Sequence, residues 1–396
     1  MKSARVIGAG LSGLTTAWHL ADRGFAVTVI DPAAGPGGLI QTRQTAHGLI
    51  ETAANAFVWS DPVAGWFQRL DLTPVFARDE SKRRYIYRDG RPRRWPLSIR
   101  ESAGLAGRLG AAAVSRGLGA RERETVAEWG DRVLGSDARQ WVLEPAMQGI
   151  YAAPASALSA RAIFSGRSRG RRRMAAPTGG MGEFTSRLHE RLVGRGVRFH
   201  FDTRVAAIEP CVPTALCTGA PAAARLLEAH APGPAARIGA VRVAPLVTVT
   251  LFFHRHPADV RGFGVLFPAA AGIGALGVLF NADIFDGRGR FRSETWIIGE
   301  RGVGSTNQTD TTLLQLLADD RARLTGRREP PLASHLTRWP SAIPVYDETI
   351  LDVKASLASL PPWIALAGNY MGRIGVAALL DQAEEAAARL HAYAHC

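Results

Sequence analysis

The feature that most constrains the fold is a glycine-rich turn between two short apolar runs near the start of the chain. Residues 5–31 read RVIGAGLSGLTTAWHLADRGFAVTVID, with Gly8, Gly10 and Gly13 in the pattern G-x-G-x-x-G. The first glycine makes a tight turn, the second lets the backbone approach a pyrophosphate, and the third allows close helix–strand packing. The helix that follows points its first amides and a partial positive charge at the phosphates. The segment therefore predicts a β-α-β unit that binds a dinucleotide.

An acidic residue and a second glycine pair indicate which dinucleotide this unit binds. Asp31 ends the second predicted strand, 18 residues after the last glycine of the pattern, close to the spacing expected for a carboxylate that bonds a ribose hydroxyl. Gly37 and Gly38 follow; such a pair also suits an ordinary surface turn. If the pair instead brings further backbone amides to a long cofactor lying across the sheet edge, it favours FAD over NAD. Leu11 and Ser12, in the first helical turn, belong to the predicted phosphate site.

Composition is that of a folded multidomain protein. The chain has 396 residues, of which 46% are hydrophobic, so two or three domains with sizeable cores are expected. The three cysteines, Cys211, Cys217 and Cys396, include no C-x-x-C pair, which argues against a disulfide scaffold or a zinc site and favours a reducing, cytoplasmic compartment. The first predicted strand leaves no room for a signal peptide. No run of 18 apolar residues occurs, so we expect no transmembrane helix.

The net charge is +13, and two clusters of basic residues stand out. Such patches attract anionic lipid surfaces, nucleic acid or polyanionic small molecules. No nucleic-acid-binding motif accompanies them, so a nucleic-acid partner is not expected. A solvated basic face without a partner, a membrane surface and a carboxylate-rich substrate remain as interpretations. The clusters are Lys82, Arg83, Arg84, Arg88, Arg91, Arg93 and Arg94, and Arg167, Arg169, Arg171, Arg172 and Arg173.

The order of apolar patterns predicts an α/β (α+β) fold with a Rossmann-like dinucleotide domain that is discontinuous in sequence. Two short strands are expected at 197–201 and 205–208, and a last strand at 364–367 precedes a glycine-rich loop and a terminal helix. This last unit is expected to return to the first sheet. The predicted domains are 1–60, 177–237 and 355–396 for the dinucleotide, 61–165 for a helical insertion, and 238–354 for an antiparallel-sheet substrate domain.

Several later motifs together resemble the flavin-dependent protoporphyrinogen/coproporphyrinogen oxidases, within the flavin amine oxidase superfamily. Glu144-Pro145 through Gly149-Ile150-Tyr151-Ala152, with Leu158-Ser159 beyond, is similar to the family's E-P-x-x-x-G-I-Y-A segment and its Leu-Ser. The other matching segments are Gly179-Gly180-Met181, Gly262-Phe263-Gly264 with Leu266, Leu276-Gly277, Ile284-Phe285, Trp339 with Ile343-Pro344 and Tyr346, and Ala367-Gly368-Asn369-Tyr370 with Gly375-Val376.

The resemblance implies FAD-dependent oxidation of a porphyrinogen (protoporphyrinogen IX or coproporphyrinogen III) in heme biosynthesis, with O₂ as acceptor. It implies an anionic tetrapyrrole substrate and a helical domain that contacts a membrane surface peripherally. Val205 would meet the adenine, and Gly368, Asn369, Gly375 and Val376 would lie near the flavin. Substrate contacts are expected from Asn55, Gly180, Met181 and Arg373, with Arg93, Arg94 and Arg167 as further candidates for its carboxylates.

No Ser-His-Asp or Cys-His arrangement stands out, so no catalytic residue is predicted; the hard chemistry would belong to the cofactor. His391 and His395 have metal-ligand spacing but lack nearby carboxylates, so no metal site is predicted and a solvated helix end is the better interpretation. The chain departs from the family at Glu51-Thr52-Ala53-Ala54, where many relatives have E-x-G-P, and at Asn55, where some relatives carry a charge. Another amine oxidase or desaturase, or an inactive flavin-binding paralogue, therefore stays as an alternative function.

Overall fold

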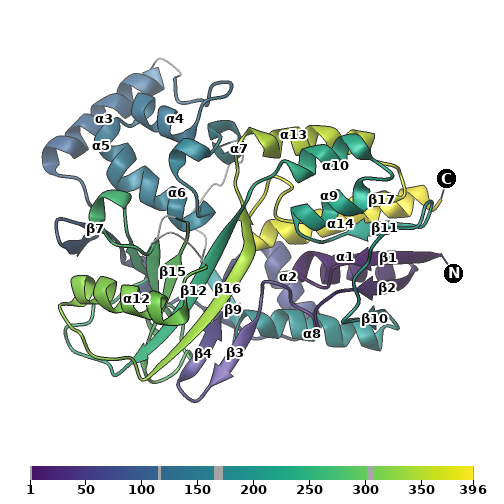
Figure 1. Cartoon of the computed structure of the whole chain (residues 1–396), viewed down its shortest axis with the longest axis horizontal. Helices are drawn as coiled ribbons and strands as arrows, with labels where there is room; N and C mark the ends of the chain where they lie inside the picture. The colour runs from purple at the N-terminus through teal and green to yellow at the C-terminus, as the bar shows by residue number, and fades with distance from the viewer. Residues whose placement is uncertain (1, 115–116, 165–172, 301–306, 396) are drawn as a thin grey trace.

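The computed structural model describes residues 2–114, 117–164, 173–300 and 307–395. At one end of the molecule lies a five-stranded sheet with strand order β10-β2-β1-β11-β17, in which every pair is parallel (Figure 1). Its strands come from three separate stretches of the chain, and the chain's two ends both lie beside this sheet. The strands are β1 (Ser3–Ile7), β2 (Ala26–Ile30), β10 (Arg198–His200), β11 (Thr214–Leu216) and β17 (Ile364–Leu366).

Helices cover both faces of this parallel sheet because its strands alternate their buried side chains between two cores. Val6, Ala215 and Ala365 belong to the core shared with helices α1, α8 and α14. Leu216 and Ile364 belong to the other core, shared with α9, α10 and α13. The discontinuous dinucleotide domain predicted from the sequence is thus present as a three-layer unit. The helices are α1 (Leu11–Asp22), α8 (Met181–Gly194), α9 (Ala220–Leu227), α10 (Pro232–Gly239), α13 (Glu348–Ser356) and α14 (Val376–Tyr393).

A second, seven-stranded sheet has the order β16-β12-β15-β14-β13-β7-β8 and is antiparallel except where β13 pairs with β7. One face is closed by α12 (Asp310–Thr325), whose Leu313 and Leu317 join Val249 and Trp296 in a separate core. Figure 1 shows the long strands β12 and β16 running from this sheet toward the parallel one. The strands are β7 (Arg84–Arg88), β8 (Arg91–Arg93), β12 (Val243–Phe253), β13 (Gly264–Leu266), β14 (Gly277–Phe280), β15 (Arg292–Ile298) and β16 (Ala333–Pro344).

The smaller elements include two further sheets and the helical insertion. A hairpin, β3 (Thr42–Thr45) and β4 (Gly48–Glu51), follows the second glycine pair, and β5 (Phe57–Val58), β9 (Met174–Pro177) and β6 (Pro74–Phe76) form a three-stranded sheet. Short α11 (Asn281–Ile284) follows β14. The insertion forms a separate helical layer in Figure 1. Its helices are α3 (Ile99–Val114), α4 (Val126–Val133), α5 (Ser136–Ala138), α6 (Glu144–Tyr151) and α7 (Ala160–Phe164).

Two segments differ from the predicted secondary structure. Residues 61–165 were expected to form a helical domain, but β6, β7 and β8 lie between residues 74 and 93 within it. The helix α2 (Asp61–Arg69) packs with Trp66 and Phe67 in the core of the dinucleotide domain. Residues 205–208, expected as a strand, form none, because no neighbouring strand offers them a ladder of hydrogen bonds. Among the described residues, no helix combines the length and apolar character needed to span a bilayer.

Candidate functional site

The predicted nucleotide-binding segments meet at the carboxyl-terminal edge of the parallel sheet. Gly8 follows β1, Asp31 follows β2, Cys217 and Thr218 follow β11, and Gly368 comes shortly after β17. Parallel strands that end at one edge bring their following loops together, and open α/β sheets bind ligands in that crevice. Segments that lie hundreds of residues apart in the chain thus contribute to one site.

The first glycine turn, Asp31 and the second glycine pair are joined through Ala9. Its amide donates to Asp31 Oδ2 at 2.6 Å, and its carbonyl accepts from the Gly37 amide at 2.9 Å. Gly10 and Gly37 form an isolated parallel bridge. Asp31 Oδ1 also accepts the Ala33 amide at 2.8 Å. A carboxylate offers about four lone-pair sites, so Asp31 retains acceptor capacity for a ribose hydroxyl.

The start of α1 fits a pyrophosphate. A Cβ on Gly10 would have only the Gly38 Cα within 4 Å, at 3.9 Å, so the backbone is open to close approach. The amides of Leu11, Ser12 and Gly13 have no intrahelical partners, because they belong to the first turn of the helix. No side-chain cap and no acidic residue of the first turn pairs with them instead. Three bare amides and the positive end of the helix dipole suit a bound anion.

Gly8 and Gly13 allow the turn to close. Gly8 has a φ of +108°, and a Cβ there would lie 2.5 Å from the Cys217 carbonyl oxygen. A Cβ on Gly13 would overlap the Gly8 carbonyl oxygen. Gly8 is thus in close contact with both the loop after β11 and the first turn of α1, and glycine at positions 8 and 13 makes both contacts possible.

The segment after β17 reaches the site from the other side. A Cβ on Gly368 would lie 3.4 Å from the Thr218 carbonyl oxygen, so this loop borders the one beside Gly8. The Gly368 amide donates to Gln382 Oε1 at 3.2 Å and is already paired. Asn369 bonds toward the second sheet. Its main-chain carbonyl accepts from the Tyr346 hydroxyl at 2.5 Å, and its side-chain Nδ2 donates to the Ala342 carbonyl at 3.3 Å.

Helix α14 resembles α1 in beginning with free amides. Its N-cap is Gly375, with no side-chain cap and no acidic residue in the first turn. Val376 is half-buried against the core of the dinucleotide domain, and α14 contacts β5. Gly375 lines a cavity beside α13 whose lining includes neither Gly10 nor Asp31. Gly375 therefore borders a cavity that is separate from the turn at the start of the chain.

Val205 and Asn55 lie in different surroundings. Val205 is half-buried beside the end of β2, where the Thr203 amide donates to the Asp31 carbonyl at 3.0 Å. The Asn55 amide donates weakly to Asn281 Oδ1 at 3.4 Å. Asn281 in turn donates to Thr295 Oγ1 at 2.8 Å, so Asn55 faces neutral polar side chains of the second sheet.

Gly180 and Met181 are both buried at the start of α8, and their contact with a substrate stays a prediction. Met181 is fully buried in the dinucleotide-domain core. A Cβ on Gly180 would lie 2.5 Å from Thr42 Cγ2, under the β3–β4 hairpin. Both residues form the start of α8, where Glu51 accepts the Met181 amide at 2.9 Å.

The carboxylate of Glu51 is held by a partner that the sequence did not reveal. Arg288 Nη1 pairs with Glu51 Oε1, and both side chains are buried, with 3% and 7% of their surface exposed. The Thr42 hydroxyl donates to the other carboxylate oxygen at 2.5 Å. No local signal distinguishes Arg288 from the other arginines, because the pair links a hairpin to a loop more than two hundred residues away.

The arginines proposed for substrate carboxylates are not gathered at one place. Arg373 lines the cavity beside α13 and lies 3.7 Å from Asp381 in an exposed ion pair. Arg93 pairs with Asp89 at 2.8 Å, and Arg94 is exposed. Arg167 lies outside the described residues. Within the described part of the chain, no cluster of His, Cys, Asp or Glu side chains could hold a metal ion.

The motifs that suggested a porphyrinogen oxidase converge where the helical layer, the second sheet and the loop after β17 meet. A Cβ on Gly149 would lie 2.6 Å from Leu266 Cδ2, so α6 presses on β13. The rings of Tyr151 and Tyr346 lie 5.2 Å apart. Ser159 donates its amide to the Tyr346 carbonyl at 2.8 Å. Tyr346, which bonds Asn369, thus joins three motifs that are distant in sequence.

Cys217 is the sulfur nearest the glycine turn, and burial raises the pKa of its thiol to about 12. The thiolate is the reactive form, so the thiol is expected to stay protonated and inert. We expect iodoacetamide at pH 8 to alkylate exposed Cys211 and to leave Cys217 unmodified in the folded protein, as read by peptide mass mapping. Denatured protein, in which Cys217 should react, is the control. Rapid modification of Cys217 in the native state would contradict this account of its environment.

A parallel, Rossmann-like sheet with a glycine-rich turn at its carboxyl-terminal edge, and a second sheet inserted in the chain, define the class of dinucleotide-binding proteins to which this fold belongs. The family model of flavin containing amine oxidoreductases matches residues 11–390. The chain belongs to the flavin-containing amine oxidoreductase family, and it is an oxidoreductase of the flavin-dependent kind.

Relatives in sequence and structure cover nearly the whole chain. The chain is 26% identical to the coproporphyrinogen III oxidase of Mycobacterium bovis, over 97% of this chain and 96% of that protein. It is 24% identical to the chloroplastic protoporphyrinogen oxidase of Oryza sativa, over 98% of this chain and 88% of that protein. A structure from Exiguobacterium with a provisional protoporphyrinogen oxidase name superposes with a TM-score of 0.83 at 17% identity, covering 99% of both chains.

Proposed function

We propose that the chain uses FAD to oxidise a porphyrinogen, protoporphyrinogen IX or coproporphyrinogen III, to the porphyrin, as a step of heme biosynthesis with O₂ as acceptor. The observation that carries the proposal is the contact of Tyr151 and Ser159 with Tyr346, and of Tyr346 with Asn369. These residues belong to segments similar to the porphyrinogen oxidases. The names of the M. bovis and O. sativa relatives support the same substrate class.

The residues at the sheet edge fit FAD. The uncapped amides of α1 and the open backbone at Gly10 would hold the pyrophosphate, and Asp31 would accept a ribose hydroxyl. The uncapped start of α14 would place a positive dipole end near the flavin ring. When bound, FAD accepts a hydride from a substrate carbon and passes electrons to O₂.

The chain's own part in the reaction is orientation and exclusion of water. Asn55 and the neutral cluster around Asn281 would face the substrate with amide and hydroxyl groups. Neutral hydrogen-bonding groups can orient the pyrrole N–H groups without holding a fixed charge against them. Tyr346 anchors Asn369 and so fixes the flavin loop against the second sheet. No side chain is assigned as the acceptor of the pyrrole protons.

The test is an aerobic assay with the purified, FAD-loaded protein. We expect coproporphyrinogen III or protoporphyrinogen IX to give porphyrin fluorescence together with H₂O₂. Turnover of an amine but of neither porphyrinogen would favour another amine oxidase. Bound flavin with no turnover of any of these substrates would indicate an inactive paralogue. Protein that takes up no flavin would overturn every enzymatic interpretation.

Replacing Asp31 by alanine is expected to weaken FAD binding by about 10- to 100-fold, because a charge-assisted hydrogen bond contributes about 1.5–3 kcal/mol. The loss of the acceptor for Ala9 also loosens the glycine turn. The measurement is quenching of FAD fluorescence on titration with apoprotein. Asp22→Ala, which removes an exposed carboxylate paired with Arg195, is the control and should bind FAD normally. Equal affinity in both variants would contradict the role of Asp31.

We also propose that α3 and the adjoining β7–β8 edge contact an anionic membrane surface peripherally. None of the residues of α3 is buried, and Ile99, Val114 and Trp95 are 92%, 89% and 52% exposed. Arg91 and Arg94 are exposed at the neighbouring edge strand. Exposed apolar side chains beside basic ones favour interfacial binding to anionic lipid.

Vesicle flotation tests this membrane contact. The protein is expected to float with vesicles that contain anionic lipid, and less with purely zwitterionic vesicles. Ile99→Asp combined with Trp95→Ala is expected to reduce flotation several-fold, because both remove apolar surface from the interface. Leu332→Asp, at an exposed apolar position just before β16, is the control. Equal flotation of all the variants would overturn the assignment of this surface.

A further inference from the structure

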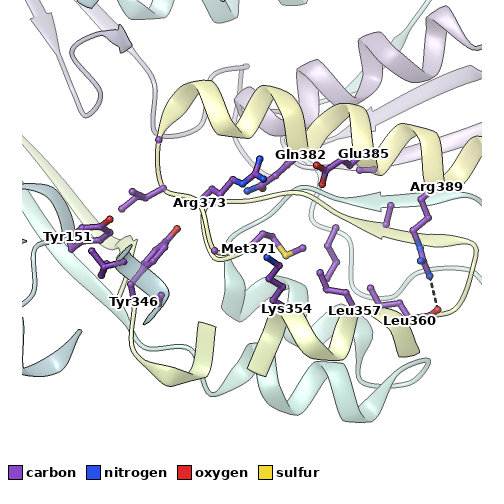
Figure 2. Close-up of a pocket in the computed structure, with 18 residues that line it drawn as sticks. Tyr151, Tyr346, Lys354, Leu357, Leu360, Met371, Arg373, Gln382, Glu385 and Arg389 are labelled. Atoms are coloured by element: carbon purple, nitrogen blue, oxygen red, sulfur yellow. Dashed lines mark hydrogen bonds between the residues drawn. The ribbon is translucent and has the colours of Figure 1, made fainter. Parts of the chain in front are cut away.

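A cavity of about 580 Å³ lies between α13, α14 and the loop 371–375. This volume falls within the range of roughly 300–1,000 Å³ typical of small-molecule sites. Figure 2 shows α14 on one side, the α13 segment on the other and the loop between them. None of the residues of the glycine turn, Asp31 or the second glycine pair lines the cavity. The cavity shares with the candidate flavin site the loop that ends at Gly375 and Gln382, which bonds Gly368; Tyr151 and Tyr346 also line it.

The walls of the cavity are apolar and polar in about equal parts, and the apolar part comes from several segments. Leu357 and Leu360 come from the end of α13 and the turn after it, and Ile163 comes from α7. Met371 and Ile374 come from the loop, and in Figure 2 Met371 lies between the two sides. An alkyl chain or ring placed among these side chains would lose water-exposed apolar surface, which contributes about 25 cal/mol per Å².

The charged side chains of the lining are mostly basic. Arg373 extends from the loop and Lys354 from α13, on opposite sides of the cavity (Figure 2). Lys354 has no acidic partner within 4 Å among the described residues. Arg373 has only its exposed contact with Asp381, whereas Arg389 is committed to the carbonyls of Ile364, Leu360 and Pro361. Glu385 is the one acidic side chain of the lining.

A buried polar group in the wall also lacks a partner. Gln382 is 6% exposed; its Oε1 accepts the Gly368 amide, and its Nε2 is buried without an acceptor. A buried donor left unpaired costs about 1–3 kcal/mol. A side-chain shift that offers this amide to an acceptor in the cavity would remove the cost.

We propose that this cavity binds an amphipathic organic anion, a carboxylate that carries an apolar chain. The carboxylate lies between Lys354 and Arg373, and the chain lies among Leu357, Leu360 and Met371. The basic pair and the apolar wall are both needed, because the ammonium and guanidinium groups are too solvated to hold a simple anion strongly at this exposed mouth. The site is distinct from the cradle of the cofactor's pyrophosphate.

The cavity's position gives its ligand a route to the flavin. Met371–Gly375 forms one wall and leads directly into α14, whose first amides face the expected flavin site. A ligand that contacts this loop favours one of its arrangements and thereby alters the surroundings of the flavin ring. Occupancy is therefore expected to change the fluorescence or absorption spectrum of the bound flavin.

The test is isothermal titration of octanoate into the FAD-loaded protein. We expect one equivalent to bind with a dissociation constant below about 1 mM. Octanamide, which lacks the charge, and acetate, which lacks the chain, should each bind at least about tenfold more weakly. Lys354→Ala combined with Arg373→Ala should weaken octanoate binding by at least about tenfold, while Lys82→Ala combined with Arg91→Ala, which removes the same charge from an exposed edge, should not.

Thermal unfolding of both double variants verifies that they are folded. Leu357→Gln provides a second, independent variant. It should weaken the binding of octanoate but leave the weak binding of acetate unchanged. Equal octanoate binding by the Lys354/Arg373 variant and the parent would overturn the proposal. So would octanamide binding as tightly as octanoate, or the absence of saturable binding.

Discussion

Gly13→Ala is expected to yield protein that does not retain flavin. Its unfolding temperature should lie well below that of the parent. The new methyl group would overlap the Gly8 carbonyl oxygen and lie 3.4 Å from Cys217 Cβ. The obstructing atom is backbone of a buried strand end, so it cannot swing aside as a flexible side chain could. Overpacking of a tight core costs about 1–3 kcal/mol or more, and a clash with backbone should reach the upper end of that range or beyond it.

Gly10→Ala is the matched variant, since it adds the same methyl group three residues earlier. Its Cβ would have only the Gly38 Cα within 4 Å, and the residue has a φ of −72°. We expect this variant to fold normally but to bind FAD at least about tenfold more weakly, because its methyl occupies the space the pyrophosphate needs.

Thermal unfolding of the apoproteins and the ratio of bound flavin to protein distinguish these two effects. The parent and Gly10→Ala should unfold at similar temperatures, and Gly13→Ala well below both. A stable Gly13→Ala protein would contradict the helix–strand approach described for this turn. Normal FAD affinity in Gly10→Ala would place the pyrophosphate elsewhere.

Arg288→Ala is expected to destabilise the protein by about 3–5 kcal/mol, because it leaves the Glu51 carboxylate buried without its partner. Native proteins have a free energy of unfolding of only about 5–15 kcal/mol, so the variant should lose a large part of its stability. Glu51 also holds the Met181 amide at the start of α8 and the Thr42 hydroxyl. The loss should therefore spread to the hairpin and to α8.

Denaturant unfolding of Arg288→Ala beside Arg290→Ala measures this effect. Arg290 is exposed in the same loop, over Phe291, so its removal should change stability by less than about 1 kcal/mol. Arg288→Met combined with Glu51→Gln removes both charges and should recover part of the lost stability. Equal stability of Arg288→Ala and Arg290→Ala would show that the buried pair contributes nothing net.

The contrast between these two sites shows what local sequence can specify. The glycine turn, α1, β2 and Asp31 lie within about thirty residues, and each step follows from backbone geometry that the residues themselves impose. The Glu51–Arg288 pair depends on where a distant loop packs. The packing of Gly180 under the β3–β4 hairpin was hidden for the same reason: a glycine pair before a helix looks alike whether it faces a ligand or a hairpin.

The helical expectation for residues 74–93 failed in part because β7 and β8 form a local hairpin, in which Arg88 pairs with Arg91. Residues 84–86 also pair in parallel with Gly264–Leu266, and nothing within 61–165 reveals that second pairing. The converse holds at 205–208, where an apolar pattern suited to a strand has no neighbouring strand. Strand formation is a property of pairs, whereas a helix bonds within itself.

The residues alone determined the dinucleotide-binding unit, the discontinuous domain and the membership of a flavoprotein family, because each rests on short-range spacing or on motifs read in combination. Only the tertiary structure decided that Tyr346 joins the helical layer to Asn369, that Arg288 balances Glu51, and that Arg373 and Lys354 face a cavity apart from the glycine turn. Those outcomes depend on contacts between segments far apart in the chain, and such contacts leave no local trace in the order of amino acids.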